Sequence, residues 1–322
     1  MAKRAFTFPG QGSQAVGMGR DLAEAYQEAR NVFAEVDEAL GQKLSVLMFE
    51  GPEDTLRLTE NAQPALMAVS VAVTRVLAAR GLHLKDQAAY VAGHSLGEYS
   101  ALAAAGAFSL ADAARLLKIR GQAMQQAVPV GQGAMAAILG LDLETVLAVA
   151  AEAGDGEVCG VANDNAPGQV VISGHTGAVA RAMELLKARG AKRALPLPVS
   201  APFHCALMQP AAEAMRAALA AVTVNAPVVP VVANVLAQPI SDPDEIRQRL
   251  VEQVTGMVRW TECVGWMTGP GGVTELVELG AGKVLSGLAK RITPDTTAIS
   301  IGTPVDVDAY VDSISRQERP DV

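Results

Sequence analysis

Apolar residues recur at helical intervals in several segments of the chain. Between residues 61 and 80, Ala65, Val69, Ala72 and Val76 lie three or four positions apart, which places them on one face of a helix. Further helices are predicted over residues 98–105, 110–126, 143–153, 177–189, 210–221 and 243–254, and others begin near residues 18 and 284. The chain is therefore expected to be rich in helices.

Short apolar runs separate these helices and predict strands. The runs lie at residues 4–9, 88–92, 134–139, 158–163, 169–173, 193–197, 228–233 and 274–279. Ala-rich helices that alternate with Val-rich strands are typical of an α/β protein. The polar tail from about Ser315 is expected to be frayed.

The middle of the chain predicts a different succession of helices and strands. Residues 128–199 predict the order β-α-β-β-α-β, with a turn signal, Asn-Ala-Pro-Gly, between the second and third strands. This order is that of a ferredoxin-like module. We expect residues 128–199 to form a small inserted subdomain, and residues 1–127 and 200–322 to form one larger α/β domain.

Composition narrows the possible partners and compartments. Half of the 322 residues are hydrophobic and the net charge is −8, which disfavours nucleic acid as a main partner. The three cysteines form no CxxC pair, so neither a disulfide framework nor a zinc site is expected. The N-terminus shows no signal peptide, and no uninterrupted apolar run approaches the roughly 20 residues that span a bilayer. We expect a cytoplasmic protein without a membrane segment.

A possible nucleophile lies between a predicted strand and a predicted helix. The sequence Gly93-His-Ser-Leu-Gly97 fits the pattern G-x-S-x-G, in which a sharp turn projects the serine hydroxyl outward. The backbone N–H of the next residue, Leu96, is then free to hold an oxyanion near the helix N-terminus. An ordinary strand-to-helix turn remains the alternative.

A serine nucleophile needs a base, and the chain has four histidines. His204 lies in a Pro-rich loop, where the chain re-enters the larger domain, and loops on a rigid scaffold often carry catalytic groups. A structural histidine is the alternative. The positions of the other three, His83, His94 and His175, favour surface or turn roles. No acidic residue near His204 suggests itself as its orienting partner.

Two further residues are candidates for binding roles. Gln11 follows the first strand and could supply a second oxyanion N–H, although a tight turn made by Gly10 and Gly12 explains the pattern as well. Arg120 lies on a predicted helix rich in apolar residues. Such arginines usually pair locally, whereas a buried one would receive a carboxylate. Neither H-E-x-x-H nor a P-loop is present, so metal-dependent hydrolysis and nucleotide chemistry lack support.

Seven motifs together resemble one family. The chain is similar to malonyl-CoA:acyl-carrier-protein transacylases, in the order of that family's motifs and to about residue 313. The motifs are Phe8–Gln14, Gln63–Leu66, Gly93–Tyr99, Arg120-Gly121, Gln169–Gly174, Ser200–His204 and Gly282–Leu285. Each motif is modest alone, but seven in register are specific.

The resemblance implies a fold and a catalytic pair. The fold is a hydrolase-like α/β core with a mostly parallel sheet, plus the ferredoxin-like insertion. Ser95 is implied as the nucleophile and His204 as its base, with oxyanion donors from the backbones of Gln11 and Leu96. The implied reaction moves a malonyl group from malonyl-CoA to an acyl carrier protein and serves fatty-acid synthesis. The enzyme is expected to be a monomer and to need neither a cofactor nor a metal.

The resemblance also implies how substrate and base are held. Arg120 would bind the free carboxylate of the malonyl group, and the main-chain carbonyl of Gln253 would orient His204. Phe203 departs from the small polar residue of many bacterial members; it accords with malonyl as substrate, or with simple packing. Two other readings remain: a serine hydrolase that uses the same turn, and a carrier-binding module without chemistry.

Overall fold

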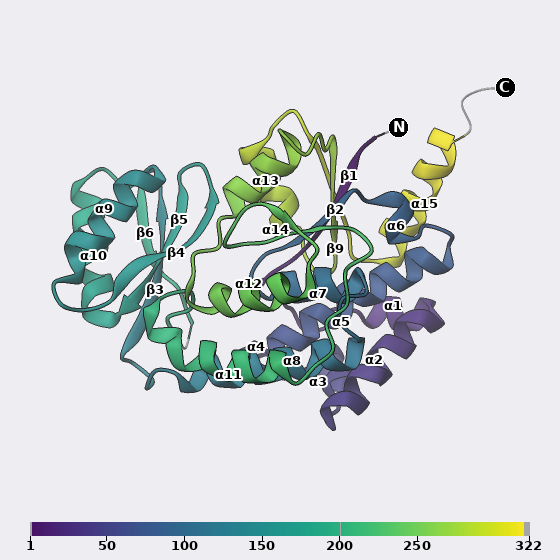
Figure 1. Cartoon of the computed structure of the whole chain (residues 1–322), viewed down its shortest axis with the longest axis horizontal. Helices are drawn as coiled ribbons and strands as arrows, with labels where there is room; N and C mark the ends of the chain where they lie inside the picture. The colour runs from purple at the N-terminus through teal and green to yellow at the C-terminus, as the bar shows by residue number, and fades with distance from the viewer. Residues whose placement is uncertain (1, 200, 319–322) are drawn as a thin grey trace.

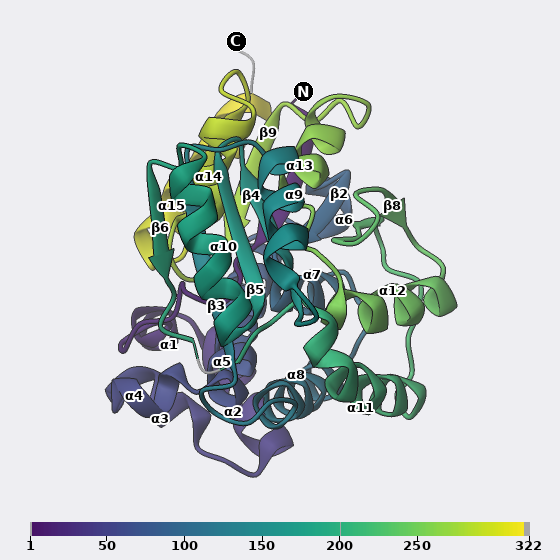
Figure 2. The same cartoon turned by 90° about the vertical axis from the view of Figure 1, so that its left-hand side faces the viewer.

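A computed structural model of the chain describes residues 2–199 and 201–318, and it contains two separate β-sheets (Figures 1 and 2). The larger sheet has the order β10-β9-β1-β2-β7-β8. All its neighbouring strands run parallel except β7 and β8. Its strands are β1 (Arg4–Phe8), β2 (Tyr90–Gly93), β7 (Val231–Val232), β8 (Pro239–Ile240), β9 (Glu275–Leu279) and β10 (Thr297–Ile301).

Helices cover both faces of the larger sheet. One face packs against the long α5 (Thr59–Ala79), with α7 (Leu96–Ala104) and α15 (Pro304–Glu318) in the same apolar core. The other packs against α13 (Trp260–Thr268) and α14 (Val284–Ile292). The remaining helices surround this centre: α1 (Arg20–Ala25), α2 (Gln27–Leu40), α3 (Leu44–Glu50), α4 (Glu53–Arg57), α6 (Leu84–Gln87), α8 (Leu110–Gln126), the 3₁₀ turn Ala206–Met208, α11 (Gln209–Ala220) and α12 (Pro243–Thr255).

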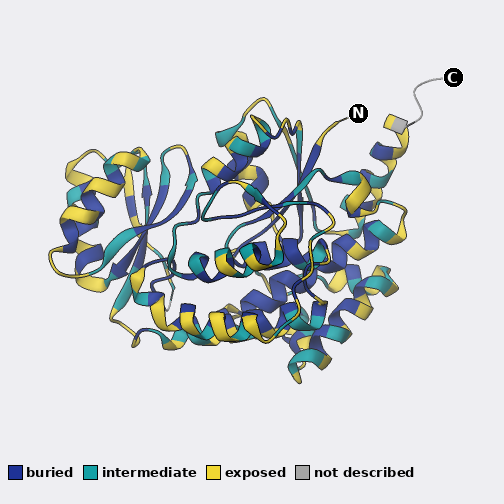
Figure 3. Cartoon of the chain, in the orientation of Figure 1, coloured by how far each residue is buried: buried dark blue, intermediate teal, exposed yellow. Residues whose placement is uncertain are grey.

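Helix α5 is almost entirely buried, as the dark ribbon at the centre of Figure 3 shows. By length and composition it is the one described helix that could cross a membrane, but 83% of its most apolar window lies inside the protein. The core helix of a soluble protein meets the same criterion, so this is weak evidence for a membrane span.

The smaller sheet is antiparallel and lies at one end of the molecule (left in Figure 1). Its order is β4-β5-β3-β6, from β3 (Gly133–Leu139), β4 (Cys159–Ala166), β5 (Gln169–His175) and β6 (Arg193–Pro196). Helices α9 (Leu143–Gly154) and α10 (Thr176–Ala188) share its apolar core. All six elements fall within the predicted insertion, and their order confirms the ferredoxin-like prediction. Strand β4 joins the rest of the molecule through contacts with α13 and α14.

Two sequence predictions at the level of elements were wrong. The predicted strand over residues 228–233 shrinks to two residues, since Pro230 has no N–H for a sheet ladder. The tail expected to fray from Ser315 continues α15 to Glu318, because Ile314 and the preceding turns pack on the core. Residues 319–322 lie outside the described residues. Strand β10 was not predicted.

Two glycines make the turn after β2 possible. A Cβ on Gly93 would lie 1.9 Å from the backbone of Gly97, and one on Gly97 would lie 2.2 Å from the carbonyl oxygen of Phe8. Both distances are far below van der Waals contact, so only glycine fits at either position. The chain can therefore pass directly from β2 into α7, which leaves Ser95 at the tip of the turn.

Candidate active site

Ser95 projects from a strained turn at the carboxyl end of the parallel sheet. Its φ of 54° lies in the left-handed region that side-chain-bearing residues rarely adopt. Strand β1, which ends before Gln11, and β7, which ends before Ala233, are the neighbours of β2 on its two sides. Because carboxyl ends of parallel strands meet at one edge, residues from three distant segments converge around Ser95.

His204 contacts the serine directly. Its Nε2 lies 2.7 Å from Ser95 Oγ, while its Nδ1 faces the carbonyl oxygens of Gln253 at 2.9 Å and Gly256 at 3.1 Å. Two carbonyls can only accept, so Nδ1 carries the proton and Nε2 accepts the hydroxyl proton of Ser95. The carbonyl of Gln253 is the expected contact; the carbonyl of Gly256 was missed.

The surroundings of His204 favour the neutral imidazole. Only 5% of the residue is exposed, and its burial, followed by the positive charge of Arg120, lowers the pKa of His204 to about 3. Desolvation and a nearby cation both disfavour the imidazolium. His204 is therefore a free base over the whole neutral range.

Arg120 is buried next to the same hydroxyl. It is 1% exposed, and its Nη2 donates to Ser95 Oγ at 3.1 Å and to Gln253 Oε1 at 2.9 Å, while Nη1 donates to Gln63 Oε1 at 2.7 Å. The guanidinium also lies 5.6 Å from the centre of the Tyr99 ring. Among residues 2–199 and 201–318, no ion pair involves Arg120, and its Nε is buried without a hydrogen-bond partner.

Of the two residues predicted as oxyanion donors, Leu96 follows Ser95 directly and Gln11 lines the cavity that contains Ser95. Leu96 is the first residue of α7, where backbone N–H groups have no partner within the helix. Gln11 follows β1 and lines the cavity around Ser95, with its side-chain Oε1 held by the hydroxyl of Thr59 at 2.9 Å.

A cavity of about 440 Å³ contains these groups. Ser95, His204 and Arg120 provide polar lining, and apolar side chains, including Phe203 and Leu197, form much of the rest. Leu197 follows β6 of the smaller sheet, so the cavity lies where the two sheets meet. A larger hollow of about 620 Å³ between α2 and α3 contains none of the candidate residues.

Behind the cavity lies a buried polar network that the sequence did not reveal. Glu98 Oε2 accepts from the backbone N–H of Asn234 at 2.9 Å and from Gln253 Nε2 at 3.0 Å. Burial raises the pKa of Glu98 to about 7, against these hydrogen bonds and the charge of Arg120, which lower it. Glu98 belongs to a quoted motif, but only the strand order shows that Asn234 lies beside it.

The other histidines contact different partners. His94 Nε2 donates to Asn165 Oδ1 at 2.8 Å, which links the turn at Ser95 to β4. His175 Nδ1 accepts from the backbone N–H of Val158, and His83 precedes α6. None of these hydrogen bonds brings one of the three histidines to Ser95.

Ser200, which belongs to the motif Ser200–His204, lies outside the described residues.

A serine and a histidine joined at the carboxyl edge of a parallel sheet, beside a helix N-terminus, define a serine-dependent acyl-transfer protein. Comparison with known families agrees: residues 5–271 match the family described as "Acyl transferase domain". The chain belongs to this family, among the malonyl-CoA:acyl-carrier-protein transacylases.

Relatives cover nearly the full length of the chain. The malonyl CoA-acyl carrier protein transacylase of Escherichia coli K12 is 51% identical over 304 residues, which are 94% of this chain and 97% of that protein. The acyl-carrier-protein-S-malonyltransferase of Bartonella henselae superposes with a TM-score of 0.95 at 56% identity, covering 97% and 99% of the two chains. The solved structure of a type II PKS acyl-carrier protein in complex with its malonyl-transacylase gives a TM-score of 0.93 at 44% identity. The match covers 97% of this chain and 100% of the matched chain.

The lowered pKa of His204 predicts an unusual pH dependence. A histidine of ordinary pKa would be only about 3% neutral at pH 5, whereas His204 stays neutral. The rate of Ser95 acylation should therefore not fall through protonation of His204 between pH 8 and pH 5. Any inflection near pH 7 should come from Glu98 and vanish in Glu98→Gln. A loss with an apparent pKa near 6.5 in both proteins, measured by single-turnover kinetics, would contradict the assignment.

Proposed function

We propose that this protein moves the malonyl group of malonyl-CoA onto the phosphopantetheine thiol of an acyl carrier protein through a malonyl ester of Ser95, and so supplies malonyl units for fatty-acid synthesis. One observation carries the proposal. Ser95 Oγ lies within hydrogen-bond distance of both a neutral base, His204, and a buried cation, Arg120. Nucleophile, base and carboxylate receptor therefore share one cavity.

In the first half-reaction, His204 Nε2 takes the proton of Ser95 as Oγ attacks the thioester carbonyl. The negative charge that develops on the carbonyl oxygen is held by the backbone N–H groups of Gln11 and Leu96. The C–S bond then breaks, the sulfur of coenzyme A takes the proton from His204, and malonyl remains on Ser95.

The second half-reaction reverses these steps with another thiol. His204 takes the proton of the carrier's phosphopantetheine thiol, the thiolate attacks the ester carbonyl, and Ser95 regains its proton as it leaves. The carbonyl of Gln253 keeps Nδ1 protonated throughout, so Nε2 faces the reacting atoms. This dyad needs no acidic orienting residue.

Arg120 would select a substrate that carries a carboxylate. Its guanidinium donates to the neutral amides of Gln63 and Gln253 and makes no direct ion pair with a described residue, so an incoming carboxylate would be its first direct anionic partner. A malonyl carboxylate would also offset the charge that lowers the pKa of His204, which makes the base stronger once the substrate is bound. Acetyl-CoA would supply neither effect.

Several further features belong to the proposal. The described residues contain no group of three or more potential metal ligands, and we propose that the reaction needs no cofactor beyond its substrates. We also propose a cytoplasmic monomer, with residues 128–199 as a subdomain inserted into a catalytic domain of residues 1–127 and 200–322. For docking of an acidic carrier, exposed Lys283 and Lys290 are better placed than Lys187 and Arg189, which pair with neighbouring glutamates.

Transfer can be distinguished from hydrolysis by following release of coenzyme A. With malonyl-CoA and an apo carrier protein, which lacks the thiol, we expect about one equivalent of coenzyme A per enzyme, followed by arrest. With the holo carrier, release should continue and match formation of malonyl-carrier. Continuous release without any carrier would identify a thioesterase and contradict the proposal.

Replacing Arg120 should change substrate preference. Since loss of a partner from a buried ion pair costs about 3–5 kcal/mol, Arg120→Ala should lower kcat/KM for malonyl-CoA by roughly 100-fold or more, with a much smaller fall for acetyl-CoA. The matched control is Arg115→Ala, an exposed arginine on the same helix. Equal losses for both substrates would remove the carboxylate-binding role.

A further inference from the structure

The backbone of Ser95 is held in place by side chains outside the reacting set. With φ 54° and ψ −111°, Ser95 occupies a strained conformation that persists only where the surroundings enforce it. Glycines allow the chain to pass, but they do not hold it there. Something else must fix the peptide groups on both sides of Ser95.

Asn234 makes the contact on one side. Its Oδ1 accepts the backbone N–H of Ser95 at 2.8 Å, and its Nδ2 donates to the carbonyl oxygen of Gly93 at 2.7 Å. The residue is completely buried. One side-chain amide therefore joins the last residue of β2 to the nucleophile and fixes the turn between them.

Gln253 makes the contact on the other side. Its Nε2 lies 3.0 Å from the carbonyl oxygen of Ser95 and 3.3 Å from Asn234 Oδ1, while its Oε1 accepts from Arg120. Glu98 links the two residues, since its Oε2 accepts from the backbone N–H of Asn234 and from Gln253 Nε2. Both peptide groups of Ser95 are thus held by one connected network.

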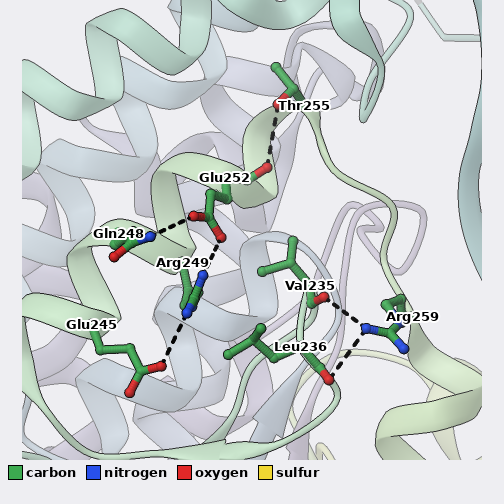
Figure 4. A network of polar contacts seen from close by, with 8 residues as sticks. All are labelled: Val235, Leu236, Glu245, Gln248, Arg249, Glu252, Thr255 and Arg259. Carbon is green, nitrogen blue, oxygen red and sulfur yellow. Dashed lines mark hydrogen bonds and ion pairs between the residues drawn. The ribbon is translucent and has the colours of Figure 1, made fainter.

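The segment that carries Asn234 is itself anchored. The backbone N–H of Arg259 donates to the carbonyl oxygen of Asn234 at 3.1 Å, and Arg259 Nη1 lies 3.1 Å from Val235 O and 3.4 Å from Leu236 O (Figure 4). In the same view Arg249 pairs with Glu252 on α12, the helix that carries Gln253. Asn234 is therefore presented from a fixed turn.

We propose that Asn234 is a positioning residue for the acyl-transfer reaction: it holds the Ser95 turn so that Oγ faces His204 and the N–H of Leu96 faces the cavity, and Glu98 keeps Asn234 and Gln253 in register. The inference rests on the proposed function. Asn234 does not reach the substrate cavity; it acts on the reaction through the main chain of Ser95.

Removing the contact should slow chemistry without weakening substrate binding. A displacement of about 1 Å can cost about 100-fold in rate, so Asn234→Ala should lower kcat for malonyl transfer by roughly that factor. KM for malonyl-CoA should change little, because Arg120 and the cavity walls remain. Asn234→Asp has the same shape but replaces the donor to Gly93 with a second acceptor, and it should also lower kcat without raising KM.

Asn61→Ala is the matched control for a merely structural effect. Asn61 is also a buried amide, which donates to the carbonyl of Thr55 and accepts from Gln42 and Lys118, away from Ser95. Its loss should reduce thermal stability without a corresponding fall in kcat.

The outcomes separate the two proposals. The inference is supported if malonyl-CoA malonylates the wild type and the Asn234 variants have a lower kcat with an unchanged KM. The inference is overturned if Asn234→Asp, or a folded Asn234→Ala, keeps kcat within about threefold of wild type. It is also overturned if the fall in kcat is no larger than that of Asn61→Ala at the same drop in Tm. If the wild type itself is never malonylated by malonyl-CoA, the proposed function fails first and the inference fails with it.

Discussion

The buried positive charge of Arg120 is the constraint around which the site is organised. A guanidinium out of water is costly unless its donors are satisfied, and here neutral amides, a serine hydroxyl and an aromatic ring surround it. Burial first, and then the same charge, lower the pKa of His204, and the charge also opposes the rise in the pKa of Glu98. In the proposed mechanism, substrate selection depends on this cation, which also contributes to the pKa shifts of His204 and Glu98.

The scaffold explains why these groups meet. The carboxyl ends of β1, β2 and β7 lie side by side, so segments far apart in sequence end at one edge. The smaller sheet adds a wall, since Leu197 follows its last strand and Met135 lies within it, and both line the cavity.

Local features were predictable from sequence, and features that depend on three-dimensional neighbours were not. Ser95 could be predicted because its motif describes a turn whose strain requires glycine on both sides. His204 followed largely from elimination among four histidines, and the role of Gln253 only from family resemblance. The part played by Asn234 and the carbonyl of Gly256 left no signal, since a backbone oxygen has no residue identity and a single asparagine acquires meaning only once β7 is placed beside β2.

The fold followed the same division. The smaller sheet and its two helices were predictable because each of these elements is short, regular and bounded by turn residues. Strand β7 was predicted too long, since an apolar run reads as a strand even where Pro230 interrupts the ladder. The final helix was missed because its exposed face is polar, although Val307, Tyr310 and Ile314 bury the other face.

The most direct test of the account is to locate the acyl group. After brief incubation with malonyl-CoA, intact-protein and peptide mass spectrometry should find one malonyl adduct, on Ser95, whereas acetyl-CoA under the same conditions should leave little. An adduct on another residue, or equal labelling by both thioesters, would contradict a nucleophile that is served by His204 and paired with the charge of Arg120.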